Sequence, residues 1–174
     1  KMAKSLENFK QELTHIRTGR ASTGLVENIE VEAYGSKMPI NQLANVTTPE
    51  PRLLLIAPWD KSQMAAIERA IMASPLEITP SNDGNVIRIP FPPLTEERRR
   101  DLVKLVSKQA EEAKVAVRNV RRHAVDAIKK EQKDGAIPED DAHRLTEEVQ
   151  KLTDDFCEQV DLAFKGKEAE IMEV

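Results

Sequence analysis

The sequence predicts an α+β protein: an elongated, antiparallel three-helix bundle into which a small α/β domain, made of β-hairpins and one helix, is inserted. Apolar residues recur at alternating steps of three and four in one segment at the start of the chain and in two segments after residue 94. This spacing is typical of helices that pack against other helices. Between residues 29 and 93 the pattern changes to that of short strands separated by Gly and Pro. The chain is 32% charged and only 3% aromatic, which also favours a helix-rich protein.

The first predicted helix begins at the start of the chain. Its apolar residues follow the a/d positions of a heptad: Met2, Leu6, Phe9, Leu13 and Ile16. Gly19 and Gly24 weaken a helix, so we expect it to end in this region.

The middle segment predicts three to five short strands and one helix. "NIEVEAYGSKMPINQL" alternates apolar and acidic residues and then reaches Gly35, which predicts a hairpin. "RLLLIAPW" is an apolar run of strand length. "DKSQMAAIERAIMAS" combines N-cap residues with helical spacing, and "LEITPSNDGNVIRIPF" is a second hairpin that turns near Gly84.

Two long helices follow a stiff linker that contains Pro90, Pro92 and Pro93. The second helix is predicted over residues 95–133, and the third runs from the turn at Gly135 and Pro138 towards Gly166. We therefore expect the bundle to comprise residues 1–20 and 94–174, and the inserted domain residues 21–93. Linkers bounded by Gly and Pro concentrate the torsions that can change. The predicted hinge comprises Arg20, Ala21, Gly24, Pro90, Pro92 and Pro93.

The charge distribution points to a polyanion as the partner. The net charge of −4 is the sum of 0 over residues 1–94, +5 over residues 95–133 and −9 over residues 134–174. At 100° per residue, five cations of the second helix fall within roughly 100° of arc. We call this set the basic stripe: Lys114, Arg118, Arg121, Arg122 and Lys129. A solvated helix face that balances the acidic third helix is an equally good interpretation of the pattern alone.

Catalytic motifs are absent from the sequence. It contains neither GxxxxGK[ST] nor GxGxxG, and its three histidines lie on different segments. The single cysteine, Cys157, cannot complete a zinc site or an intrachain disulfide, and it lies among apolar residues. We therefore expect no enzymatic activity, no cofactor and no metal site. No apolar run reaches the roughly 20 residues that span a bilayer, so no membrane partner is expected.

Several segments resemble the ribosome recycling factor family, and they keep the order that they have in that family. The matching segments cover essentially the whole chain: "IRTGRAS", "AIMAS", "PPLTEERRRDLVKLV", "VAVRNVRR" and "EDDAHRLTEEVQKLTD". The resemblance implies an L-shaped protein of roughly transfer-RNA dimensions. It also implies binding to the large ribosomal subunit after termination, followed by splitting of the ribosome together with elongation factor G and GTP hydrolysis by that factor.

The resemblance also assigns residues to ribosomal RNA. The basic residues of the family that face the RNA of the large subunit match Arg17 and Arg20 on the first helix. On the second helix they match Arg118, Arg121 and Arg122, whereas Lys114 and Lys129 join the set only through helical geometry. The sequence departs from many relatives at His123, where an acidic residue is frequent, and at Pro138, where a serine-like N-cap is usual.

Two rival functions differ in class from ribosome recycling. A coiled-coil scaffold or chaperone-like RNA binder would use its heptads to recruit a partner helix and would self-associate, whereas a closed bundle predicts a monomer. An enzyme would need a motif that the sequence lacks.

The protein is expected to be located in the bacterial cytoplasm. The chain begins at Lys1 without a Met, so we expect that some residues precede it. Location in an organelle would require a transit peptide among those residues.

Overall fold

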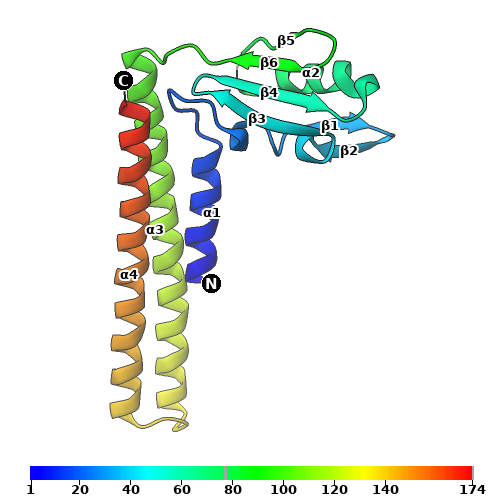
Figure 1. Ribbon diagram of the computed structural model, residues 1–174. Helices are drawn as coiled ribbons and strands as arrows, with labels where there is room; N and C mark the ends of the chain where they lie inside the picture. The colour runs from blue at the N-terminus through cyan, green and yellow to red at the C-terminus, as the bar shows by residue number, and fades with distance from the viewer. Residues whose placement is uncertain (77, 174) are drawn as a thin grey trace. The chain divides into compact units, whose positions relative to one another are not determined.

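The computed structural model describes residues 1–76 and 78–173 and contains long helices and a small antiparallel β domain (Figure 1). The fold is α+β, as predicted. Its residues group into two compact units. The first comprises Lys1–Leu13 and Val103–Ala169, and the second comprises Thr14–Leu102 and Glu170–Val174. The domain boundaries at residues 20/21 and 93/94 stay a prediction.

The first unit contains most of three helices: α1 (Met2–Thr14), α3 (Glu96–Lys133) and α4 (Glu139–Met172). The ends of these helices at residues 14, 96–102 and 170–172 belong to the second unit. Helix α3 begins after Thr95, whose Oγ1 accepts a hydrogen bond from the backbone N–H of Arg98 at 3.2 Å, and Glu96 and Glu97 occupy its first turn. It ends before Gly135, whose φ of 78° closes the turn into α4. Helix α1 ends at Thr14, earlier than the Gly19 region that the sequence suggested.

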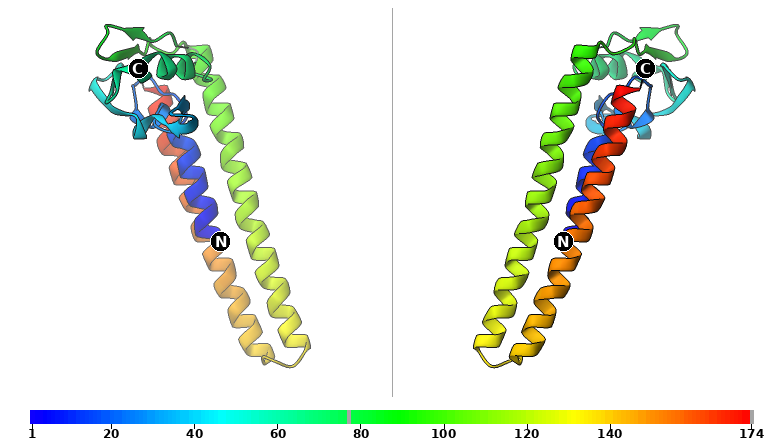
Figure 2. Two further views of the ribbon diagram at one scale, coloured as in Figure 1. Left: turned by 90° about the vertical axis from the view of Figure 1, so that its right-hand side faces the viewer. Right: turned by 90° about the vertical axis from the view of Figure 1, so that its left-hand side faces the viewer.

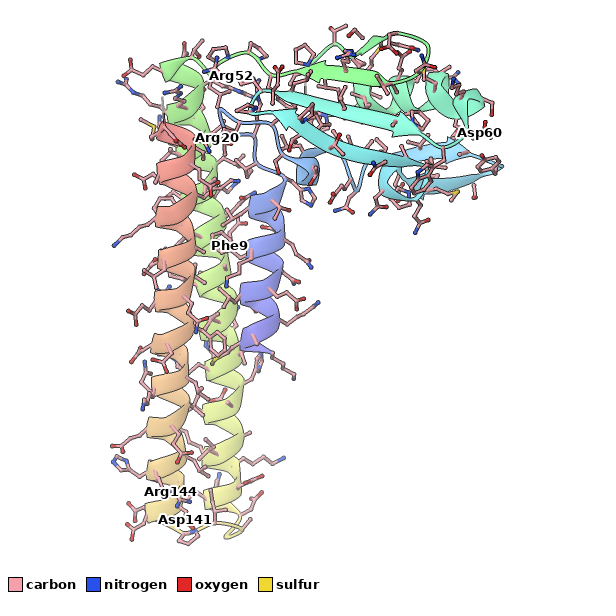
Figure 3. The ribbon with its side chains drawn as sticks, viewed as in Figure 1. Phe9, Arg20, Arg52, Asp60, Asp141 and Arg144 are labelled. Atoms are coloured by element: carbon pink, nitrogen blue, oxygen red, sulfur yellow. The ribbon has the colours of Figure 1, made fainter. Side chains whose placement is uncertain are left out.

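Helix α1 runs beside only part of the α3–α4 hairpin and does not reach the turn between α3 and α4 (Figures 1 and 2). Phe9, labelled in Figure 3, is 2% exposed, and Val106, Val117 and Val160 of the long helices are fully buried. Ala127, which has an apolar heptad position near the turn, is exposed. The core of the bundle is therefore deepest where α1 is present.

The heptad spacing of the sequence places seven residues of α4 on its buried face: Ala142, Leu145, Val149, Leu152, Phe156, Val160 and Ala163. This prediction is wrong at one position. Leu152 is 52% exposed, whereas the next residue, Thr153, is 3% exposed. The buried face steps through Val149, Thr153, Phe156 and Val160, so Leu152 lies about 100° away from it. Thr153 is tolerated there because its Oγ1 donates to the carbonyl oxygen of Val149 at 2.8 Å.

The second unit contains two antiparallel sheets. Strands β1 (Glu30–Ala33) and β2 (Ser36–Pro39) form the first predicted hairpin, whose turn residues Tyr34 and Gly35 have positive φ. The larger sheet has the order β3-β4-β6-β5. Its strands are β3 (Ala44–Glu50), β4 (Leu53–Pro58), β5 (Ser81–Asn82) and β6 (Ile87–Pro90), and helix α2 spans Met64–Met72. The described residues therefore form six strands, where three to five were predicted.

The core of the second unit is aliphatic. Its fully buried side chains come from both sheets, from α2 and from the short segments between them: Val26, Val31, Ile40, Leu54, Ile56, Ile67, Ile71, Ile87 and Ile89. The apolar run that predicted β4 places this strand at the centre of the sheet, paired with both β3 and β6.

Candidate nucleic-acid interface

All five residues of the basic stripe lie on α3, but the structure gives them different environments. The side chain of Lys114 is only 20% exposed, whereas Arg122 and Lys129 are exposed. Among the described residues, neither Arg122 nor Lys129 forms an ion pair. These two cations are therefore the most accessible of the five to an external anion.

Lys114 is engaged within the bundle. Its Nζ lies 3.0 Å from Oδ1 of Asp161 on α4 and 3.5 Å from Oε2 of Glu111 on α3. The hydrogen bond with Asp161 raises the pKa of Lys114, which stays charged at neutral pH. Lys114 thus connects two helices, and its assignment to RNA, which came from helical geometry alone, stays a prediction.

Arg118 and Arg121 have partners that are themselves solvent-exposed. Nη1 of Arg118 lies 3.3 Å from Oε1 of Glu111, and Nη1 of Arg121 donates to Oε1 of Gln150 at 3.1 Å. Exposed pairs of this kind contribute at most about 1 kcal/mol. Both guanidinium groups can therefore exchange these partners for a phosphate at small cost. The pairing of Arg118 with Glu111 could have been predicted, because two helical turns of sequence separate them and place them on the same helix face.

Arg17 is directed into the protein. Its Nη2 donates to the carbonyl oxygen of Pro92 at 2.5 Å, and its guanidinium carbon lies 5.5 Å from the centre of the Phe91 ring. Burial and the nearby positive charge of Arg98 lower the pKa of Arg17, and its Nε is buried without a hydrogen-bond partner. This geometry gives Arg17 a structural role, joining the segment after α1 to the segment after β6, and leaves its assignment to RNA a prediction.

Replacing Arg17 by alanine is expected to lower the free energy of unfolding by about 1–2 kcal/mol, because the change removes one hydrogen bond from a charged donor and one cation–π interaction. Arg17→Lys should recover part of this loss, because lysine keeps the positive charge but lacks the planar guanidinium group. Urea unfolding followed by circular dichroism measures both variants, with Lys10→Ala as the exposed control. A stability equal to that of the wild type would contradict the structural role.

Arg20 is exposed, and its Nη2 lies 2.8 Å from Oε1 of Glu173. The backbone N–H of Arg20 donates to Oγ1 of the buried Thr18 at 3.3 Å, which fixes the turn after α1. The five other assigned cations lie on α3 and in the first unit, whereas Arg17 and Arg20 belong to the second unit.

The two chain segments that contain the predicted hinge residues each form one backbone hydrogen bond with the turn between β3 and β4. The backbone N–H of Ala21 donates to the carbonyl oxygen of Pro51 at 2.6 Å, and that of Phe91 donates to the carbonyl oxygen of Arg52 at 2.7 Å. Gly24 packs closely, because a Cβ there would lie 3.2 Å from the carbonyl oxygen of Thr14. All the hinge residues, including Pro90, Pro92 and Pro93, fall inside the second unit. Their role as a hinge stays a prediction.

The described residues contain no group of three or more His, Cys, Asp or Glu side chains that could hold a metal ion. Within the same residues, no helix is long and apolar enough to cross a membrane. Cys157 is partly buried, and this burial raises the pKa of its thiol.

Comparison with known proteins identifies the family. A family model described as "Ribosome recycling factor" matches residues 9–172. The chain is 59% identical to the ribosome-recycling factor of Halalkalibacterium halodurans and 56% identical to that of Geobacillus kaustophilus, in each case over 100% of this chain and 94% of the relative.

Solved structures agree with this match. A solution structure of a ribosome recycling factor superposes with a TM-score of 0.81 at 48% identity, covering 99% of this chain and 92% of that one. A second structure has a TM-score of 0.69 at 46% identity over 99% of this chain and 93% of that one. It is described as the T. thermophilus ribosome recycling factor and E. coli elongation factor G bound to the E. coli post-termination complex. The chain belongs to the ribosome recycling factor family.

Proposed function

We propose that this protein binds the large ribosomal subunit after termination and, together with elongation factor G and GTP hydrolysis by that factor, splits the post-termination ribosome for reuse. The observation that carries the proposal is the match of the family over the whole chain, with a relative described on the post-termination complex beside elongation factor G. We place the protein in the bacterial cytoplasm and assign it no catalytic step of its own.

The geometry of α3 supports RNA binding by the basic stripe. Four cations of the stripe are available to RNA: Arg118 and Arg121, whose partners are exposed, and Arg122 and Lys129, which form no ion pair among the described residues. All four lie on one helix of 38 residues, which holds them in a fixed line. Arginine binds phosphate oxygens through a planar fork of donors, which suits binding to an RNA backbone. The 13 acidic residues after residue 133 would repel RNA from the other long helix.

The splitting step is expected to need the hinge. The bundle anchors on RNA while the inserted domain moves about residues 20–26 and 90–93 when elongation factor G pushes on it. A packed helix bundle is stiff enough to transmit such a force to the bridges between the subunits.

Splitting of post-termination ribosomes measured by light scattering tests the function. With elongation factor G and GTP, the protein should lower the scattered intensity as ribosomes separate into subunits. Without elongation factor G, or with a GTP analogue that is not hydrolysed, the intensity should stay constant. A constant intensity under the full conditions would contradict the proposal.

The same assay tests the hinge. In a Cys157→Ser background, one cysteine is introduced into the predicted bundle (residues 1–20 and 94–174) and one into the predicted inserted domain (residues 21–93), and the pair is joined by a short cross-linker. The joined protein should bind large subunits and fail to split ribosomes, while the variant without the cross-linker does both. Full splitting by the joined protein would rule out the hinge.

A monomer in solution separates this function from that of a coiled-coil scaffold. Light scattering on the purified protein should give a mass near 19.6 kDa. A dimer or larger assembly would favour the scaffold.

A further inference from the structure

We propose that a pocket in the second unit, lined by Arg20, Arg52 and Arg99, receives a phosphate group of the RNA backbone. This inference rests on the proposed function and adds two arginines to the RNA-binding set. Arg52 lies in the turn between β3 and β4, and Arg99 lies in the first turns of α3. Neither was selected from the sequence, because neither belongs to a helical stripe.

The pocket is large enough for a phosphate group. Its volume is about 210 Å³, several times the volume that a water molecule occupies in the liquid. Arg20 and Arg52, labelled in Figure 3, come from two different segments of the chain, and Arg99 comes from a third. Three separate segments of the chain therefore contribute arginine residues to the lining of the pocket.

The hydrogen-bonding capacity of these arginines is not used up within the protein. The Nε of Arg99 is buried and has no hydrogen-bond partner. The guanidinium of Arg52 has no carboxylate at ion-pair distance within the described residues. Phosphate is the acceptor whose oxygens best match the fork of arginine.

Two glutamates line the same pocket and reduce its positive charge. Glu173 is paired with Arg20 at 2.8 Å, and Glu170 already has an interaction of its own. Three arginines against two glutamates leave the lining of the pocket with one excess positive charge. An anion is therefore favoured over a cation.

Binding to purified large ribosomal subunits across a salt series tests the proposal. The Arg52→Gln, Arg99→Gln double variant should bind about tenfold more weakly than the wild type, because two charged hydrogen-bond donors to the phosphate are removed. The slope of log K against log salt should fall by roughly 0.7–0.9, because one phosphate is no longer neutralised. Arg52→Lys, Arg99→Lys keeps the charges and should give an intermediate affinity.

Arg69→Gln is the matched control, because Arg69 is exposed in the same unit and its Nε only bonds the carbonyl oxygen of Ala65. The control should bind like the wild type. If the double glutamine variant also keeps the affinity and the salt slope of the wild type, the pocket does not bind RNA and the proposal is overturned.

A titration with inorganic phosphate, followed through the arginine Nε–H signals in NMR spectra, separates the two sources of phosphate. If the slope of log K against log salt is lower for the double variant than for the wild type, the pocket binds an RNA phosphate. This holds whether or not the Arg99 signal also shifts with inorganic phosphate. Shifts without a change of slope indicate a site for free phosphate and overturn the assignment to RNA. If the wild type does not bind large subunits at all, the proposed function fails, and the titration then decides whether the pocket binds phosphate.

Discussion

Replacing Arg118, Arg121 and Arg122 by alanine is expected to weaken binding to large ribosomal subunits by about a hundredfold to a thousandfold. Each arginine can donate charge-assisted hydrogen bonds to phosphate, worth about 1.5–3 kcal/mol before its present partner is given up. The slope of log K against log salt should fall by roughly 0.7–0.9 for each phosphate that is no longer neutralised. The measurement is binding to purified large subunits at several salt concentrations.

The control variant removes three cations from the other long helix: Arg144→Ala, Lys151→Ala and Lys165→Ala. These residues are exposed on α4, so the control changes the net charge by the same amount. It should keep the affinity of the wild type to within a few-fold. Equally weakened binding in both variants would mean that net charge alone decides binding, and the basic stripe would then be an ordinary solvated face.

The second large effect is on stability. Phe9→Ala is expected to lower the free energy of unfolding by about 3–5 kcal/mol, because it removes a buried aromatic side chain and leaves a cavity. Phe9 is 2% exposed, and only Met2, Leu6 and Leu13 are buried on the same short helix. Few other buried side chains are therefore available to keep α1 packed on α3 and α4.

Urea unfolding followed by circular dichroism at 222 nm measures this change, with Lys10→Ala as the exposed neighbouring control. The fluorescence of Trp59, the only tryptophan, serves as a separate probe of the second unit. The dichroism midpoint should move to lower urea concentration in Phe9→Ala and stay unchanged in Lys10→Ala. An unchanged midpoint in both would show that α1 contributes little to the stability of the bundle.

The elements that carry a strong local pattern could be predicted. Heptad spacing predicted α1, α3 and α4, and the Gly-containing turns predicted both hairpins. Strand β3 was missed because "ANVTTPE" is mostly polar and contains Pro49. It forms because it is the edge strand beside β4, where proline is tolerated and one pairing partner is enough.

By itself the sequence determined the fold class, the family and the helix that carries the basic stripe, because periodicity and motifs depend on residues close together in the chain. Only the tertiary structure decided which cations are free. Arg17 donates a hydrogen bond to Pro92, which lies 75 residues further along the chain. Arg20 donates one to Glu173, which lies 153 residues further along. Lys114 likewise pairs with Asp161 on another helix, and Arg52 and Arg99 line one pocket only in the folded protein. Such partners are set by the packing of distant segments, which no local pattern encodes.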